Sequence, residues 1–438
     1  MTSAATLIDR SVWRSVPVMK SAIYGVDIRT NPKPIAERSL RELAAASEDV
    51  AAIAECVALA DRLFTRRRSI QWARKLELII PVYDLPTFQS DAIVGALTET
   101  LHFLTGDEWM VSFVARSCKR ESFPYLPFER TPKSVIPFSD GLDSHALLEL
   151  IRFERGVGYA EPVRVGLFQS DSHARQAQAL RIPRRFSGAH PRERSYRSRP
   201  FVFFSIAAIA CAAFKGEAVL IGENGQGSLG TTFAVFADEW PFRSTHPGFL
   251  RRLAKFLSLA LNRPVEFEQP LLWQTKGEVL LKLMQRGVLG EWRNTRSCSQ
   301  RPLQRRMREA CGFCGGCLLR QVSTASAHLP IEPDRAFSCS AIDLIVEDRL
   351  GQQRLMTKND RQVLSRAAFS ISLFAEVEQA ESKTGAIAGA LPEIAGNGDR
   401  ASAEVKLRRL IQSHKAEWNS FLMSLPDQAW LRKQFLTP

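Results

Sequence analysis

The fold of this chain is decided by the stretch Ser134-Val-Ile-Pro-Phe-Ser139-Asp-Gly-Leu-Asp-Ser144-His-Ala-Leu-Leu-Glu-Leu-Ile151. An apolar run ends at Phe138, small residues follow, and the remainder has the composition of a helix. A tight turn at such a junction directs backbone N–H groups and two hydroxyl groups at one point, where the helix dipole adds positive potential. We therefore expect a buried strand, a turn that binds phosphate or pyrophosphate, and a helix. The turn is not a Walker A loop, because the chain contains no Gly-Lys-Ser or Gly-Lys-Thr.

The same alternation of strand and helix continues along the chain. Short apolar runs at 134–138, 163–168 and 218–221 alternate with helical segments at about 143–154 and 201–214. Strands separated by helices predict an α/β fold with a parallel sheet and helices on both faces. In such sheets ligands bind at the carboxyl ends of the strands, so we look for function in the residues that follow each run.

Three parts can be distinguished along the chain. Residues 1–130 have their own alternation of strand and helix patterns and predict an N-terminal α/β unit. Residues 131–325 contain the strand–turn–helix repeats and a cysteine-rich loop. Residues 326–438 are predicted to be mainly helical, with a flexible Gly/Ala-rich linker at about 384–400.

The composition is that of a folded protein with a large core. Of the 438 residues 45% are hydrophobic and 24% are charged, which excludes disorder as the dominant state and excludes a small disulfide scaffold. The longest apolar stretch, 201–214, is too short to span a bilayer. The first residues show no basic start and no apolar segment, so we expect a cytoplasmic protein with no membrane partner.

The excess positive charge is concentrated in two places. The formal net charge is +13, and residues 173–199 hold eight arginines against one glutamate. Residues 296–320 hold six arginines, again against one glutamate. A local excess indicates an anionic ligand, either nucleotide phosphates or a nucleic acid. The first stretch is equally typical of a solvated loop.

Four cysteines have the spacing of a metal site. Cys298 precedes Cys311, Cys314 and Cys317, and the last three are separated by two-residue spacers that contain glycine. Four thiolates suit a closed tetrahedral zinc site of structural type, and an iron–sulfur cluster is the alternative. Four thiolates around Zn²⁺ carry a net charge of −2, which the neighbouring arginines would offset.

The turn after Phe138 resembles the pyrophosphatase loop, Ser-Gly-Gly-x-Asp-Ser, of the PP-loop (HUP-like) ATP-pyrophosphatases. Members of that superfamily cleave ATP between the α and β phosphates to adenylate a substrate oxygen. Asp140 stands where the family usually has a second glycine. A carboxylate at this position either repels pyrophosphate or helps to hold Mg²⁺.

The loop followed by the cysteine cluster is similar to the QueC family, the 7-cyano-7-deazaguanine synthases, over residues 133–325. Two further segments agree with that family, Glu217-Ala-Val-Leu-Ile-Gly-Glu-Asn224 and Pro270-Leu-Leu-Trp-Gln-Thr-Lys276-Gly-Glu278. The resemblance implies ATP, Mg²⁺ and a 7-deazaguanine acid, 7-carboxy-7-deazaguanine, as ligands, with structural zinc on the four cysteines. It implies ATP binding by Ser139, Asp140, Gly141, Leu142, Asp143 and Ser144, catalytic roles for Asp143 and Lys276, and substrate binding by Arg199, Glu223, Asn224 and His246.

Two departures from the family concern the acceptor. The family's substrate loop, Gly-Tyr-Pro-Asp-Cys-Arg, is missing, and the chain has about twice the family's usual length. Both features are more similar to the QueC-like components (QatC) of bacterial antiphage defence operons. We therefore expect a ligase that passes the activated carboxylate to an amine on a partner protein encoded nearby. The alternatives are synthesis of the nitrile, with ammonia as the amine, and modification of tRNA.

Two other hypotheses compete with this interpretation. The segment Gly225-Gln-Gly-Ser-Leu-Gly230 matches G-x-G-x-x-G, but the residues after it favour a strand over the helix that a dinucleotide site requires. A nucleic-acid-binding module would account for the arginines but leaves the loop after Phe138 unexplained, so it is not favoured. His145, directly after that loop, is either an acid–base catalyst or part of the first helical turn.

Overall fold

We describe the protein from a computed structural model, in which the described residues form two compact units. Unit 1 contains described residues from 1–139, 157–221 and 236–268, and unit 2 contains those from 140–156, 222–235 and 269–438. The structure describes residues 4–9, 18–23, 32–66, 72–117, 120, 133–139, 141–155, 161–167, 174, 178–183, 192–193, 195–235, 239–290, 292–295, 297–298, 310–329 and 358–436.

Unit 1 contains the parallel sheet that the sequence predicts. Its strands lie in the order β7 (Leu180–Arg181), β6 (Val163–Gly166), β5 (Val135–Pro137), β8 (Val219–Leu220) and β9 (Phe267–Glu268). All neighbouring pairs are parallel, and Val135 in the central strand pairs with both Val163 and Val219. The three residues of β5 are buried, as expected for a strand covered on both faces.

A second, mixed sheet lies in the N-terminal part of unit 1. Its strands are β2 (Val18–Ile23), β1 (Ala4–Asp9), β3 (Lys75–Val82) and β4 (Glu108–Ala115), in that order. The first strand pairs antiparallel with β2 and β3, whereas β3 and β4 are parallel. The short helices α1 (Lys33–Ser39) and α3 (Leu85–Phe88) also belong to this part of the chain.

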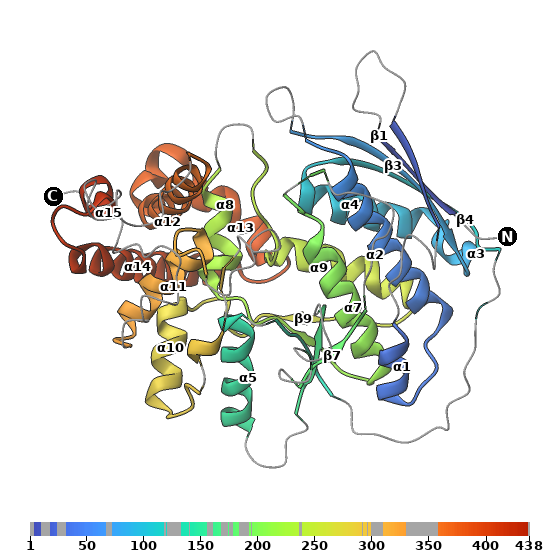
Figure 1. The fold of residues 1–438 in the computed structure, drawn as a ribbon, viewed down its shortest axis with the longest axis horizontal. Coiled ribbons are helices and arrows are strands. Elements are labelled where there is room, and N and C mark those ends of the chain that lie inside the picture. The colour runs from blue at the N-terminus through green and yellow to red at the C-terminus, as the bar shows by residue number, and fades with distance from the viewer. Residues whose placement is uncertain are drawn as a thin grey trace. The chain divides into compact units, whose positions relative to one another are not determined.

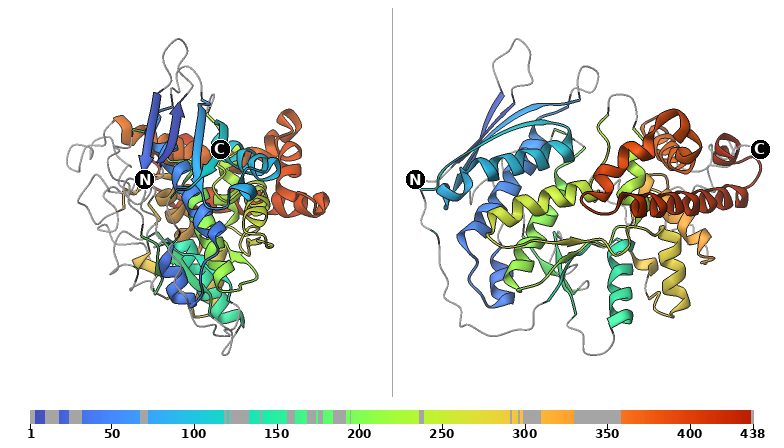
Figure 2. Two further views of the ribbon diagram at one scale, coloured as in Figure 1. Left: turned by 90° about the vertical axis from the view of Figure 1, so that its right-hand side faces the viewer. Right: turned by 180° about the vertical axis from the view of Figure 1, so that it is seen from behind.

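Four helices fill the space between the two sheets of unit 1. Helices α2 (Ala45–Leu63) and α4 (Asp91–Thr105) pack on the N-terminal sheet, which curves over them (Figures 1 and 2). Helices α7 (Arg199–Ala213) and α9 (Pro247–Ala260) pack against the parallel sheet. The two pairs also contact one another, α2 with α7 and α4 with α9, so the unit is layered as sheet, helices, helices, sheet.

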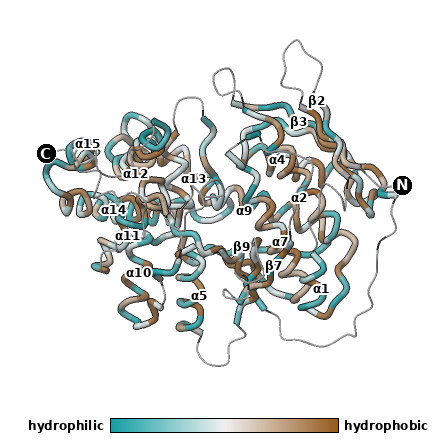
Figure 3. Tube along the Cα trace, in the orientation of Figure 1, coloured by the Kyte–Doolittle hydropathy of each residue, from teal (hydrophilic) through white to brown (hydrophobic). Residues whose placement is uncertain are grey.

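The layered arrangement explains the composition of α7. This helix is apolar along nearly its whole length (Figure 3), which is typical of a helix that is buried on all sides. Its residues belong to the same hydrophobic core as those of α2, α4 and both sheets. The predicted boundary near residue 130 therefore does not separate two cores among the described residues, and the independence of residues 1–130 stays a prediction.

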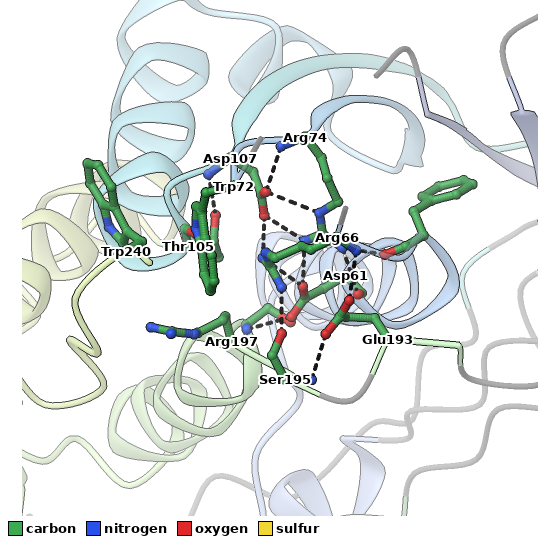
Figure 4. A network of polar contacts seen from close by, with 12 residues as sticks. Asp61, Arg66, Trp72, Arg74, Thr105, Asp107, Glu193, Ser195, Arg197 and Trp240 are labelled. Carbon is green, nitrogen blue, oxygen red and sulfur yellow. Dashed lines mark hydrogen bonds and ion pairs between the residues drawn. The ribbon is translucent and has the colours of Figure 1, made fainter. Parts of the chain in front are cut away.

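A buried ion network holds the helical layer of unit 1 together (Figure 4). The guanidinium group of Arg74 lies 2.6 Å from the carboxylates of both Asp61 and Asp107. Arg66 pairs with the same two carboxylates, and all four side chains are at most 2% exposed. Burial alone would raise the pKa of Asp61, but Arg66 and Arg74 outweigh it and hold that pKa below its ordinary value.

The network also fixes part of the first arginine-rich stretch. The backbone N–H of Ser198 donates to Asp61 at 2.8 Å, and Glu193 accepts from the backbone N–H of Arg66 at 2.8 Å. Arg197 lies over the ring of Trp72, 4.9 Å from its centre. These residues are therefore used for packing within unit 1. Four other arginines of this stretch, Arg175, Arg184, Arg185 and Arg194, lie outside the described residues.

Unit 2 is mainly helical, as predicted for the C-terminal part of the chain. It contains α5 (Leu142–Arg155), a π-helical turn (Gln226–Gly230), α8 (Thr231–Phe233), α10 (Lys276–Gln285), a 3₁₀ turn (Trp292–Asn294), α11 (Gly315–Ser326), α12 (Lys358–Thr384), α13 (Ala386–Ala395), α14 (Arg400–Ser424) and α15 (Trp430–Phe435). Helices α11, α12 and α14 pack against one another around Trp418. No helix in the described ranges is both long and apolar enough to cross a bilayer.

The linker predicted at about 384–400 is wrong. The structure has helix α13 there, and Ile387, Leu391 and Ile394 are buried against α12 and α14. Their spacing of three or four residues places them on one face of the helix. The prediction of a linker was based on the glycines at both ends of the stretch.

Candidate functional site

The turn after β5 leads into α5 as the sequence predicts. Helix α5 begins at Leu142, and the Ser144 hydroxyl donates to the Gly141 carbonyl at 3.0 Å. A Cβ atom added to Gly222 would lie 2.8 Å from the Asp143 carbonyl oxygen, so the segment after β8 passes directly against this first turn. Only glycine permits that approach. Asp140 lies outside the described residues, and its predicted role with Mg²⁺ stays a prediction.

The centre of the site in unit 2 is an ion pair between Asp143 and Lys276. The ammonium group of Lys276 lies 2.8 Å from Asp143 Oδ2. The side-chain amide of Asn224 donates to the other carboxylate oxygen, Oδ1, at 2.8 Å. The structure thus brings together three of the predicted site residues, which come from three distant parts of the sequence.

Glu223 completes this group of charges. Burial, together with the negative charge of Asp143, raises the pKa of Glu223 to about 8. The Glu223 carboxyl group is therefore largely protonated at neutral pH. Burial would lower the pKa of Lys276, but Asp143 and Glu223 outweigh that effect and hold it above its ordinary value. Lys276 is thus a charged residue that is 5% exposed and pairs with Asp143.

Lys276 is presented by the first turn of α10, which packs beside α5 (Figure 1). Thr275 and Glu278 form a capping box, in which Thr275 Oγ1 accepts from the Glu278 N–H at 3.0 Å and Glu278 accepts from the Thr275 N–H at 2.9 Å. The box fixes where the helix begins and hence the direction of the lysine side chain. The N-terminal end of a helix also carries positive potential, which adds to that of the ammonium group.

The glycine-rich segment after Asn224 does not form a dinucleotide turn. It forms a π-helical turn, and the helix that follows, α8, has only three residues. Gly227 lies against Glu223, because a Cβ atom there would come within 2.1 Å of the Glu223 carboxyl oxygen. The segment therefore packs around the site, which agrees with the prediction against a dinucleotide-binding helix.

Sequence reasoning missed three polar residues behind Lys276. Gln226 accepts from the backbone N–H of Lys276 at 2.8 Å, and its amide lies next to His414 and Glu417 of α14. Gln226 lies within the G-x-G-x-x-G segment, whereas His414 and Glu417 belong to no motif. Only the i, i+3 spacing of these two polar residues on one apolar helix face could have indicated them.

Two predicted substrate residues belong to unit 1. His246 caps α9, since its Nδ1 atom accepts from the Gly248 N–H at 3.1 Å, and its ring packs 5.7 Å from that of Phe103. Arg199 is the exposed first residue of α7. Ser139, the half-buried last residue of the segment after β5, also lies in unit 1. A substrate role for Arg199 and His246 stays a prediction. In unit 2, His145 lies half-buried in the first turn of α5.

The four predicted cysteines form a compact cluster in unit 2. Their sulfur atoms all lie within 4.8 Å of one another, and the Cys311–Cys317 and Cys298–Cys314 separations are 3.9 and 4.0 Å. A tetrahedral zinc ion with Zn–S bonds of ~2.3 Å separates its sulfurs by about 3.8 Å, so the cluster fits zinc. The Cys314 backbone N–H also donates to the Cys311 sulfur at 3.3 Å, as a thiolate requires.

One arginine of the stretch 296–320, Arg320, stabilises the structure around the cysteine cluster. Its side chain is 3% exposed and donates to the carbonyl oxygens of Trp292 and Thr295 at 3.0 and 3.1 Å. These bonds hold the segment before Cys298 against α11. The arginines between Cys298 and Cys311 lie outside the described residues.

The fold and the site define a class of protein: an α/β protein of the PP-loop type, with a four-cysteine cluster that fits a metal ion and a helical C-terminal region. Residues 169–328 match the model of the family described as "Queuosine biosynthesis protein QueC". The match includes Glu223, Asn224, Lys276 and the four cysteines, and it begins after the loop at 139–144. It supports an ATP-using, QueC-like enzyme of the 7-cyano-7-deazaguanine synthase kind. No curated protein matches the chain.

Proposed function

We propose that this protein is an ATP-dependent carbon–nitrogen ligase that adenylates 7-carboxy-7-deazaguanine and transfers the acyl group to an amine on a partner protein, in antiphage defence. The observation that carries the proposal is the ion pair of the buried Lys276 with the half-buried Asp143 at the first turn of α5, with Glu223 and Asn224 beside it. The QueC family match supports the substrate class.

In the first step a carboxylate oxygen attacks the α phosphorus of ATP, and the bond to the bridging oxygen of the β phosphate breaks. The products are an acyl-adenylate and pyrophosphate. Negative charge develops on the departing pyrophosphate, where Lys276, Ser144 and the N–H groups of the first turn of α5 would stabilise it. The lysine suits this role because its charge is already fixed in a buried, preorganised position.

In the second step an amine attacks the acyl carbon and forms an amide. AMP leaves, and the amine loses one proton. Asp143 holds the ammonium group of Lys276 in place through both steps, while the protonated Glu223 adds no negative charge near the phosphates at neutral pH. Mg²⁺ would offset further phosphate charge, and its ligands in this chain stay a prediction.

The bond cleaved in ATP tests the first step. Protein mixed with ATP, Mg²⁺ and the acid should release AMP and pyrophosphate, which chromatography of the nucleotides measures directly. Lys276→Met should reduce both products by at least about a hundredfold, since a buried charged donor to the transition state is worth that much. Lys282→Met is the matched control, because Lys282 lies on the same helix in an exposed pair with Glu154. Release of ADP and orthophosphate would show that the assignment to PP-loop chemistry is wrong.

The acceptor is tested separately by mass spectrometry of both pools, small molecules and protein. The wild-type enzyme is mixed with ATP, the acid, ammonium and the candidate partner protein. An added mass on the partner supports transfer to protein, whereas a nitrile with no mass added to protein supports synthesis of 7-cyano-7-deazaguanine. The second outcome is favoured by the family description, and it would retain the first step while overturning the proposed acceptor.

A further inference from the structure

A chain of hydrogen bonds connects the C-terminal helix α14 to the backbone of Lys276. Gln226 lies at its centre: its carbonyl oxygen accepts from the Lys276 N–H at 2.8 Å. Its amide nitrogen lies 2.8 Å from His414 Nδ1 and donates to Glu417 Oε2 at 3.1 Å. The other oxygen of Glu417 accepts from the hydroxyl group of Thr275, the residue that caps α10.

The direction of the two bonds made by His414 is determined. His414 Nε2 lies 2.9 Å from the Ile371 carbonyl oxygen, which can only accept, so the proton is on Nε2. Burial lowers the pKa of His414 to about 4, so the ring is neutral and Nδ1 accepts from Gln226. Both N–H groups of Gln226 are then donated to α14, and its oxygen must point toward Lys276.

The residues of this chain are buried and closely packed. Gln226, Thr275 and His414 are at most 4% exposed, and Glu417 is 7% exposed. A Cβ atom added to Gly277 would come within 2.3 Å of Glu417 Oε1, so α14 lies directly against the first turn of α10. A buried network with every member satisfied is rigid and holds one geometry.

We propose that Gln226 and Glu417 are positioning residues that hold the first turn of α10 so that Lys276 meets Asp143. Helix α14, which carries Glu417, lies outside the segment, residues 169–328, that matches the QueC family model. The proposal rests on the proposed function for its kinetic consequence, but its geometry can be tested without turnover.

Two single substitutions break the chain while keeping the size of the side chains. In Glu417→Gln the oxygen of the new amide can accept from either Gln226 or Thr275. The NH₂ group of the amide then faces the donor of the other residue, and that hydrogen bond is lost. In Gln226→Glu two carboxylates face each other. The double variant Q226E/E417Q restores a donor opposite an acceptor between positions 226 and 417, and it leaves His414 Nδ1 facing a carboxylate oxygen. Glu404→Gln is the control, because Glu404 lies on α14 in a partly exposed pair with Arg408.

The first readout is kinetic. We expect kcat for pyrophosphate release to fall about tenfold to a hundredfold in each single variant, since a displaced catalytic group costs that much, with little change in KM for ATP. We expect the double variant to recover most of kcat, and Glu404→Gln to match the wild type. Single variants with wild-type kcat would overturn the proposal, as would a folded double variant that recovers nothing.

The second readout needs no substrate. Acetic anhydride labels lysine amines, and peptide mass spectrometry compares the labelling rate of Lys276 with that of Lys282 in the same molecule. Lys276 should label slowly in the wild type and in the double variant, and several-fold faster in each single variant. An unchanged rate in folded single variants overturns the proposal even if the wild type proves to have another activity. If a single variant does not fold, as judged by its melting temperature, the comparison of the double variant with the wild type decides.

Discussion

Among individual residues, Lys276 and Glu223 set the electrostatics of the candidate site. Two half-buried carboxyl groups lie near one buried ammonium group, which pairs with Asp143, while Glu223 is largely protonated at neutral pH. A ligand that brings further negative charge, such as a nucleoside triphosphate, meets a positive lysine and a neutral acid. The same site would repel it once Glu223 lost its proton.

The pH dependence of the reaction follows from Glu223. Because its pKa is raised to about 8, activity should fall as pH rises through that value, and Glu223→Gln should remove this alkaline decrease. Its pKa is above the ordinary value, so its contribution to stability is complete below about pH 4.5 and is lost as pH rises toward 8. Rates of pyrophosphate release from pH 6.5 to 9.5 measure the first effect, and an unchanged alkaline decrease in Glu223→Gln would contradict it.

The sequence predicted the residues of the site that stand in motifs, and missed those that support them. Asp143, Glu223, Asn224 and Lys276 follow strands or begin helices, where the rules for parallel sheets direct attention. His414 and Glu417 come from a helix more than a hundred residues away, and only the tertiary structure places them beside Lys276. His246 caps α9 and Arg199 begins α7, and a substrate role for either residue stays a prediction.

At the scale of elements, the cysteine loop before α11 is the clearest case for a metal test. Cys314→Ser should abolish binding of one zinc ion per chain and lower the melting temperature of the protein, because three thiolates hold the metal poorly. Metal content by elemental analysis and a thermal melt measure the two effects. Iron in the wild-type protein, or no bound metal, would exclude the zinc assignment.

Substitutions in α13 can distinguish a packed helix from a flexible linker, because only a packed helix predicts changes in stability. Leu391→Ala should cost about 2–4 kcal/mol of stability, because it leaves a cavity in the core between α12 and α14. Gly389→Ala should instead add about 0.5–1 kcal/mol, since the glycine is exposed within a helix and nothing lies within 4 Å of the new methyl group. Denaturant unfolding measures both, and two silent substitutions would indicate a linker.

The boundaries of the elements around the site could largely be predicted. Thr275 and Glu278 have the spacing of a capping box, and the strand before Ser139 was recognised from its apolar run. The same reasoning failed for 384–400, because glycine and alanine dominate its composition and only three apolar positions define its buried face.

On the scale of the whole molecule, the ion network of unit 1 connects parts of the chain that the sequence separates. Asp61 and Asp107 belong to the N-terminal segment, whereas Glu193 and Ser198 precede α7. No sequence pattern announces such pairing, because each residue alone is typical of a solvated surface. The sequence predicts an α/β unit over residues 1–130, and the independence of that unit stays a prediction.

Removing one member of the network should be costly. Asp61→Asn leaves Arg66 and Arg74 with an unbalanced buried charge and should cost about 3–5 kcal/mol. Because the pKa of Asp61 lies below its ordinary value, its stabilising effect is present above about pH 4 and is lost as pH falls further. The free energies of unfolding of the wild type and of Asp61→Asn should therefore become more similar as pH falls below about 4. Glu99→Gln, which removes an exposed pair with Arg252, is the control and should change stability by less than about 1 kcal/mol.

The helical layer shared by the two sheets has a consequence for hydrogen exchange. Because α2 and α7 each cover a different sheet and also cover each other, neither sheet can lose its helices without exposing apolar surface on the other. Backbone amides in β3 and β5 should then exchange with deuterium through one common opening, with equal free energies and equal dependence on denaturant. A chain cut near residue 130 would leave α7 with an exposed apolar face, and such a chain should aggregate.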